Sequence, residues 1–191
     1  MLVCQAWYAA KLFLNRAVPE ETMQAAYAAV RRECLNLVLT GMPGSGKTTL
    51  GKAAARMLGR QFVDLDEEIV KRHGPILDIF KNRGEAAFRE MESEIIREFT
   101  KESGLVIATG GGAVLRQENL GVLKQNGTVI FLDRELSALL PTADRPLADS
   151  EEKLRALYTE RRPIYLKAAD VTLAVEGTPE QTADALMRCL L

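Results

Sequence analysis

Cysteine and histidine are scarce in this chain of 191 residues. Its three cysteines, Cys4, Cys34 and Cys189, are far apart and form no CxxC pair, which argues against both a metal site and a disulfide framework. Free thiols in a reducing compartment are the alternative. The only histidine is His73, and a lone histidine is more often a surface or helix-end residue than a catalyst. We therefore expect a cytoplasmic protein whose chemistry rests on other residue types.

Long apolar runs and an excess of one charge are also missing. No stretch is long and apolar enough to cross a bilayer. The net charge is −1 with both signs well mixed, whereas proteins that bind nucleic acid or membrane surfaces usually carry a basic excess. Hydrophobic residues make up 47% of the chain, enough to bury a core. The length fits one domain with an appendage, and we expect no nucleic-acid or membrane partner.

The sequence pattern changes near residue 35. Before it, apolar residues recur at helical spacing, and Pro19 followed by Glu20 and Glu21 is typical of a helix start. Residues 1–34 are therefore predicted to form a helical extension, and residues 35–191 a separate domain.

In the domain of residues 35–191, short apolar runs alternate with helical stretches. The runs, predicted as strands, cover residues 35–40, 61–65, 105–109, 128–132 and 171–175. The predicted helices cover residues 47–58, 67–72, 76–82, 85–102, 117–125, 151–167 and 179–190. This alternation predicts a parallel sheet covered on both faces, with ligands at the carboxyl ends of the strands.

A phosphate-binding P-loop occupies residues 41–49, with the sequence GMPGSGKTT. It follows a predicted strand and opens a helix, which is the expected context for this motif. Lys47 is predicted to reach the β- and γ-phosphates of a nucleoside triphosphate, and the Thr48 hydroxyl to bind Mg²⁺. The backbone N–H groups of the loop would wrap the phosphates. The predicted nucleotide-binding set is Gly44, Ser45, Gly46, Lys47, Thr48 and Thr49.

Two aspartates, Asp64 and Asp66, end the second predicted strand. Alternation along a strand would place both on one side, facing the ligand crevice, where one supports the metal and the other takes or orients a hydroxyl proton. The alternative is that Asp66 caps the following helix. Asp133, at the end of the fourth strand, fits the loose Walker B pattern, but many buried strands end in this way. Metal support from Asp64 instead would indicate a small-molecule kinase rather than a motor.

Arginines and glycines complete the set of candidate site residues. Arg89 and Glu92 lie three residues apart and should be neighbours on one helix face, either as an exposed ion pair or as a positioned carboxylate receptor. Three glycines, Gly110, Gly111 and Gly112, follow the third strand and permit close backbone approach by a ligand. Arg145 lies in a polar segment that we interpret as a lid, near residues 137–152. Arg161 and Arg162 stand just before Pro163, where we expect a helix to end, and are candidates for binding an anion.

From Leu35 to the C-terminus, the chain resembles the shikimate kinase family. The resemblance rests on six motifs that occur in the family's order: GMPGSGKTT, Asp-x-Asp, FREME, Gly-Gly-Gly, DRPL and RRPIY. The resemblance implies a nucleoside monophosphate kinase-like P-loop fold of three layers, with parallel strand order 2-3-1-4-5. It also implies transfer of the ATP γ-phosphoryl group to the 3-hydroxyl of shikimate, a step of aromatic amino-acid (chorismate) biosynthesis. The implied cofactors are ATP and Mg²⁺, and the partner is the small molecule shikimate.

The resemblance also carries roles for single residues. Lys47, Asp66 and Arg145 match the catalytic set, and Thr48 and Asp64 match the metal site. Arg145 matches a lid arginine that touches both substrates. The residues that match the shikimate site are Asp66, Arg89, Glu92, Gly110, Gly111, Gly112, Arg145 and Arg161. Arg161 is chosen over Arg162 because the family arginine lies two residues before its proline.

Two features depart from the family or lie outside it. The segment between Asp133 and Arg145 is short and has Ala138, Leu139 and Leu140 where the family commonly carries an adenine-stacking arginine. The first residues, MLVCQAWYAAKLF, resemble the end of shikimate dehydrogenase, which would make the chain a fragment of a dehydrogenase–kinase fusion. The alternative is a plain helical extension, and we expect a monomer.

Two other functions fit the same motifs. One is a P-loop kinase that acts on another small acidic polyol, such as gluconate. The other is a nucleotide-dependent binding module whose acceptor site is inactive.

Overall fold

The computed structural model describes residues 2–15, 17–139 and 150–190. The chain divides into two compact units, Met1–Leu35 and Asn36–Leu191, each described by itself. The first unit contains two helices, α1 (Leu2–Leu14) and α2 (Glu20–Cys34), as the sequence predicts. The indole N–H of Trp7 in α1 donates to the carbonyl oxygen of Val18, 3.1 Å away, just before α2. The resemblance of this unit to a dehydrogenase tail stays a prediction.

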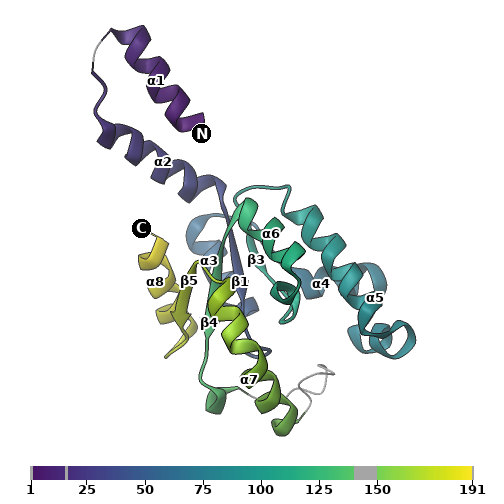
Figure 1. Cartoon of the computed structure of the whole chain (residues 1–191). Coiled ribbons are helices and arrows are strands. Elements are labelled where there is room, and N and C mark those ends of the chain that lie inside the picture. Colours follow the sequence, from purple (N-terminus) through teal and green to yellow (C-terminus); the bar gives the residue numbers. More distant parts are fainter. Residues whose placement is uncertain (1, 16, 140–149, 191) are drawn as a thin grey trace. The chain divides into compact units, whose positions relative to one another are not determined.

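The second unit is built on a five-stranded parallel sheet (Figure 1). Its strands are β1 (Asn36–Thr40), β2 (Phe62–Asp64), β3 (Val106–Ala108), β4 (Gly127–Asp133) and β5 (Val171–Ala174). The strand order is β2-β3-β1-β4-β5, and every pairing is parallel. This confirms the predicted fold class and strand order.

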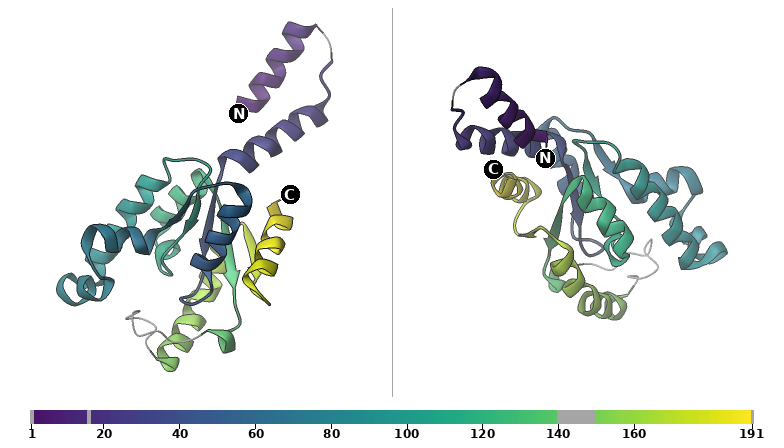
Figure 2. Two further views of the ribbon diagram at one scale, coloured as in Figure 1. Left: turned by 180° about the vertical axis from the view of Figure 1, so that it is seen from behind. Right: turned by 45° about the horizontal axis from the view of Figure 1, so that its top comes forward.

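Helices cover both faces of the sheet, because the buried strands are apolar on both sides (Figure 2). Along β1, Leu37 and Leu39 pack on one face while Val38 packs on the other. The first face is covered by α3 (Lys47–Leu58) and α8 (Pro179–Leu190). The helices that share the opposite core are α4 (Leu65–His73), α5 (Ile76–Phe99), α6 (Gln117–Gln125) and α7 (Glu151–Ala168). Two short 3₁₀ helices are η1 (Ala113–Leu115) and η2 (Leu136–Ala138).

Two helix predictions need correction. The stretches predicted separately at residues 76–82 and 85–102 are the two arms of α5, which kinks at Gly84 with φ 78° and ψ 171°, backbone angles that favour glycine. Helix α7 runs through Pro163 to Ala168, in agreement with the helix predicted at residues 151–167, so the expectation that a helix ends just before Pro163 is wrong. Packing of α7 against β4 and η1 offsets the loss of the backbone hydrogen bond that a proline inside a helix removes.

None of the helices in the described ranges is long and apolar enough to cross a membrane.

Gly51 marks the tightest contact between α3 and the sheet. A Cβ atom at this position would overlap the ring of Phe62 and would lie 3.3 Å from Leu39. Gly121 in α6 is the matched control, because it is exposed and a Cβ there meets no atom within 4 Å.

We predict that Gly51→Ala lowers the free energy of unfolding by about 1–3 kcal/mol through overpacking. Gly121→Ala should instead raise the free energy of unfolding by roughly 0.5–1 kcal/mol, because alanine is the better helix former. Chemical denaturation of both variants measures the difference. Equal effects of the two substitutions would contradict this close packing.

Candidate active site

The P-loop connects β1 to α3 and uses glycine where the backbone requires it. Gly44 has φ 80°, and Gly46, which immediately precedes α3, has φ 95°; both are left-handed conformations that side chains disfavour. The loop therefore delivers its N–H groups to the N-terminus of α3, a favourable place for phosphate. The Lys47 ammonium donates to the carbonyl oxygens of Gly41 at 3.0 Å and Met42 at 2.9 Å. These contacts hold the lysine side chain against the loop, with its ammonium lining the cavity described below.

Asp64 joins the P-loop to the turn between β2 and α4. One of its carboxylate oxygens accepts a hydrogen bond from the Thr48 hydroxyl at 2.6 Å. The other oxygen accepts from the backbone N–H groups of Asp66 at 3.1 Å and Glu67 at 3.4 Å. Asp64 is thus the cap of α4, and the sequence-based alternative that Asp66 is the cap is wrong. Asp66 lies in the first turn of α4, so strand alternation does not place it; the strand-to-helix turn does.

The pairing of Thr48 with Asp64 fits a magnesium site. A hydroxyl and a carboxylate are oxygen donors of the kind that Mg²⁺ takes, usually together with substrate phosphates and water. Within residues 2–15, 17–139 and 150–190, no group of three or more histidine, cysteine, aspartate or glutamate side chains is arranged to hold a metal alone. Thr48 and Asp64 would hold such an ion together with the phosphates of a nucleotide.

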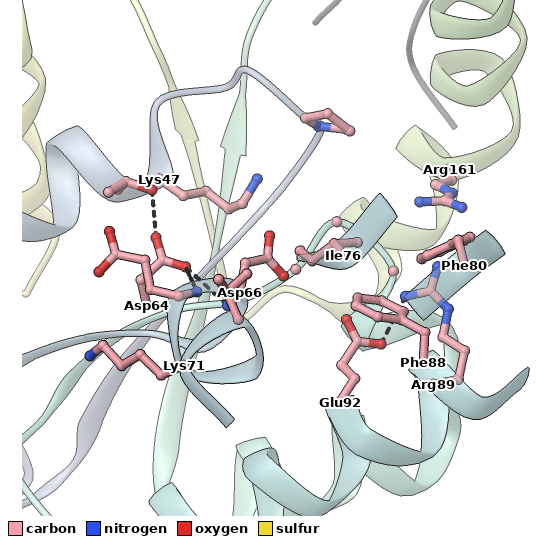
Figure 3. A pocket seen from close by; sticks show the side chains of 17 residues that line it. Lys47, Asp64, Asp66, Lys71, Ile76, Phe80, Phe88, Arg89, Glu92 and Arg161 are labelled. Carbon is pink, nitrogen blue, oxygen red and sulfur yellow. Dashed lines mark hydrogen bonds and ion pairs between the residues drawn. The ribbon is translucent and has the colours of Figure 1, made fainter. Parts of the chain in front are cut away.

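A cavity of about 580 Å³ gathers most of the predicted residues (Figure 3). In Figure 3, Lys47 and Asp64 lie on the left, Arg89 and Arg161 on the right, and Asp66 between them. The predicted residues that line the cavity are Lys47, Thr48, Asp64, Asp66, Arg89, Glu92, Gly110, Gly111, Gly112 and Arg161. The cavity thus has a phosphate-binding side and a side with two arginines, joined by an aspartate.

Arg89 and Glu92 form a buried ion pair within α5. The Arg89 guanidinium donates to Glu92 at 2.8 Å and to Glu85 at 3.0 Å. The Glu92 side chain is 0% exposed and that of Arg89 11%, so the alternative of an exposed pair is wrong. Burial raises the pKa of the Glu92 carboxyl above its ordinary value of 4.5, although Arg89 acts in the opposite direction. Burial tends to lower the pKa of Arg89, but Glu92 and Glu85 outweigh it, so the pKa is raised and the guanidinium stays charged.

The side chains of Arg161 and Arg162, neighbours in α7, lie in different environments. Arg161 is buried and lines the cavity, and it forms no ion pair within the described part of the chain. Its Nε atom is buried without a hydrogen-bond partner. Arg162 instead makes two hydrogen bonds to Asp133, at 3.0 and 2.7 Å. The aspartate that fits the Walker B pattern is therefore held by Arg162, and it does not line the cavity.

The three glycines after β3 pack against side chains of the site. A Cβ on Gly110 would lie 2.5 Å from Glu92 and 2.8 Å from Asp66, and one on Gly112 would overlap the Arg89 guanidinium. Asp66, Glu92 and Arg89 lie in the space left by the missing side chains of Gly110 and Gly112, so the glycines let two acids and an arginine converge on the loop. All three glycines also line the cavity, and close approach of a ligand to their backbone stays a prediction.

The remaining predicted residues lie elsewhere. Ser45, Gly46 and Thr49 line a smaller cavity of about 140 Å³ beside the P-loop, together with Arg134 and residues around α8. Gly44 belongs to the P-loop and lines neither cavity. Arg145 and most of the predicted lid fall outside the described residues.

Several cavity residues escaped the sequence analysis. Phe80 and Phe88 pack with ring centroids 4.9 Å apart and, with Ile76, give the cavity an apolar wall. Lys71 lines it too and forms an ion pair with Glu68. The FREME motif contains Phe88 but gives it no role. Gly84 is the one local sign of the kink in α5 that separates the arm with Phe80 from the arm with Phe88.

Comparison with known proteins gives consistent matches. The sequence model of the family described as "Shikimate kinase" matches residues 43–191. A shikimate kinase of Nitrosomonas europaea is 39% identical over 164 residues, covering 82% of this chain and 76% of the relative. One of Persephonella marina is 40% identical, covering 80% and 96%. The structure resembles shikimate kinase from Acinetobacter baumannii in complex with shikimate, with TM-score 0.80, 35% identity, and 85% and 96% of the two chains covered.

The P-loop, the paired acid and arginine of α5 and the buried Arg161 thus occur in a chain that matches one family over most of its length. This chain belongs to the shikimate kinase family.

Proposed function

We propose that this chain transfers the γ-phosphoryl group of ATP to the 3-hydroxyl of shikimate and releases shikimate 3-phosphate. The observation that carries the proposal is Arg161, a buried cation that faces the cavity and forms no direct ion pair within the described part of the chain, although the charge of Glu92 acts on it through space. A buried charge is costly unless it is paired, so the cavity favours an anionic ligand. Shikimate supplies one carboxylate and three hydroxyls, which matches the arginines and acids of this cavity.

On the acceptor side, the carboxylate of shikimate would lie between Arg89 and Arg161. Guanidinium groups bind carboxylates through paired, charge-assisted hydrogen bonds. Glu92 holds Arg89 by its 2.8 Å contact and leaves its other oxygen, Oε1, without a protein partner beside Gly110. That oxygen is placed to accept a hydrogen bond from a substrate hydroxyl. Phe80 and Phe88 would pack on the apolar edge of the ring.

On the donor side, the P-loop N–H groups and Lys47 would bind the phosphates of ATP. Thr48 and Asp64 would hold Mg²⁺, which supplies charge neutralisation at the β- and γ-phosphates. The P-loop and Lys47 are fixed before substrate arrives, so they can stabilise the charge on the phosphates without a large rearrangement.

Asp66 lies between the two halves and is proposed to accept the proton of the 3-hydroxyl. The hydroxyl oxygen forms a bond to the γ-phosphorus while the bond to the β–γ bridging oxygen breaks, and ADP leaves. Positioning of the two substrates in line supplies most of the catalysis in such transfers. Arg145 keeps the role implied by the family resemblance, that of a lid arginine contacting both substrates.

We also propose that the chain works as a monomer, as the sequence analysis expects. Light scattering on the purified protein tests the monomer. We further propose that residues 1–34 derive from the end of a shikimate dehydrogenase, which the Met-Leu-Val-x-Gln-Ala pattern of residues 1–6 supports. The reading frame upstream of Met1 tests this origin, and a frame encoding no dehydrogenase would contradict it.

The substrate assignment is tested by coupled-enzyme turnover with ATP and a panel of hydroxy acids, including shikimate and gluconate. We predict turnover on shikimate, and that Asp66→Asn lowers kcat about 10²- to 10⁴-fold while ATP binding, measured by calorimetry, stays within about twofold. Turnover on gluconate but not on shikimate would contradict the substrate. A chain without any turnover would favour the nucleotide-binding module.

The assignment of the two arginines in α7 is tested by a matched pair of variants. Arg161→Lys should raise the KM for shikimate about 10- to 100-fold, because an ammonium cannot reproduce a paired guanidinium contact. Arg162→Lys is the control, since Arg162 binds Asp133 outside the cavity, and it should change this KM less than about threefold. A larger effect at Arg162 than at Arg161 would reverse the assignment.

Glu92 generates a prediction on pH and stability. Its pKa is raised in the folded chain, so folding favours the protonated carboxyl. Its stabilising contribution is therefore present below the ordinary pKa of 4.5 and is lost as pH rises through the higher folded value. Relative to Glu92→Gln, the free energy of unfolding of the wild type should fall as pH is raised from about 4 to 7.

Chemical denaturation across this pH range measures the slope. Glu94→Gln on the exposed side of α5 is the control and should give a nearly constant difference. A wild-type advantage that grows with pH would show that the pairing with Arg89 outweighs the cost of burial.

A further inference from the structure

Tyr165 connects α7 to the glycine loop. Its side chain is fully buried, and its hydroxyl donates a hydrogen bond to the carbonyl oxygen of Gly111. The ring stacks on Phe131 of β4, with centroids 5.2 Å apart and planes inclined by 27°. Tyr165 does not line the cavity that contains the arginines and acids. It therefore supports this site from behind the loop.

The loop held by Tyr165 touches both halves of the site. Gly111 packs against Pro43 of the P-loop, and its neighbours on either side pack against acidic and basic groups of the acceptor side. Three consecutive glycines carry the highest conformational freedom of any such segment. A hydrogen bond at the middle glycine fixes the loop where freedom would otherwise be greatest.

The same hydrogen bond steadies the turn of α7 that carries Arg161. Pro163 lies inside this helix and has no N–H, so the carbonyl of Thr159 loses its usual backbone donor. The helix is therefore weakened in the turn from Thr159 to Pro163, which contains Arg161. Anchoring Tyr165 to Gly111 and to the ring of Phe131 compensates for that weakness.

The Tyr165 hydroxyl remains a donor at every pH at which the chain is expected to work. Burial raises its pKa to about 12, although the positive charges of Arg161 and Arg89 act in the opposite direction. The hydrogen bond to Gly111 is thus not lost by ionisation near neutral pH.

We infer that Tyr165 is a positioning residue that sets the distance between Arg161 and the glycine loop, and thereby tunes affinity for the carboxylated substrate without touching it. The inference rests on the proposed function, since it concerns the acceptor side of that reaction. It assigns the residue to shikimate binding and not to ATP binding, because the glycines on either side of Gly111 meet Asp66, Glu92 and Arg89 of the acceptor side, and the P-loop residue nearest to Gly111 is Pro43, whose ring binds no phosphate.

Tyr165→Phe tests the inference, because it keeps the stacked ring and removes only the hydroxyl. We expect the KM for shikimate to rise about tenfold, since a buried carbonyl loses its partner and the loop gains freedom. The KM for ATP should stay within about twofold and kcat within about threefold. Tyr158→Phe, in the same helix and half-buried, is the matched control and should leave both KM values unchanged within about twofold.

A general loss of packing would move both KM values together, so a joint rise would overturn the inference, as would an unchanged KM for shikimate. Calorimetric titration of the folded variant with ADP and with shikimate gives the same separation without turnover. Only the shikimate affinity should fall, and loss of ADP affinity as well would count against the inference. If the wild type itself does not turn over shikimate, the proposed function fails instead.

Discussion

Two guanidinium groups share one cavity in this chain, and the way their charge is satisfied governs the arrangement around them. Arg89 is paired directly with the fully buried Glu92, whereas Arg161 forms no direct ion pair among the described residues and interacts with Glu92 only at longer range. Two guanidinium charges in the same low-dielectric cavity are unfavourable unless a bound anion balances the second of them. The glycine loop must then be narrow enough for Glu92 and Arg89 to approach it, which excludes side chains at Gly110 and Gly112.

The two halves of the site are built in different ways. The phosphate side is mostly backbone: a glycine-containing turn at the end of β1 and the start of α3, with Lys47 held by loop carbonyls. The acceptor side consists mostly of side chains on α4, α5 and α7. Helices α4 and α5 follow one another in the chain, whereas α7 is distant in sequence and brings Arg161 to the same cavity. Asp64 couples the halves by capping α4 while it accepts a hydrogen bond from Thr48.

Much of this arrangement could be predicted from local patterns. The spacing of the glycines, Lys47 and Thr48 between a predicted strand and a predicted helix identifies the P-loop. The separation of three residues predicts that Arg89 and Glu92 are neighbours on one helix face. The strand order and the choice of Arg161 came from family resemblance, because no local rule separates Arg161 from Arg162. The structure separates them by giving Arg162 a partner, Asp133.

Other features depend on tertiary packing that a single sequence does not reveal. Asp64 could be predicted as the cap of α4 only if the end of β2 were known to lie at Asp64 and not at Asp66. The helix predicted at residues 151–167 does span Pro163, but the packing of Tyr165 on Phe131 and its hydrogen bond to Gly111, which permit this proline inside α7, are tertiary contacts. The apolar wall of Phe80 and Phe88 arises from the kink at Gly84, so its place in the cavity could not be inferred from helical spacing.

The central claim is that the two arginines and Asp66 define opposite ends of one carboxylated polyol. A crystal structure of the chain with ADP, Mg²⁺ and shikimate measures this most directly. The account predicts the carboxylate of shikimate within hydrogen-bonding distance of both Arg89 and Arg161, with the 3-hydroxyl beside Asp66 and directed at the P-loop. A carboxylate bound at Lys47 or Lys71, with Arg161 making no contact to the ligand, would contradict it.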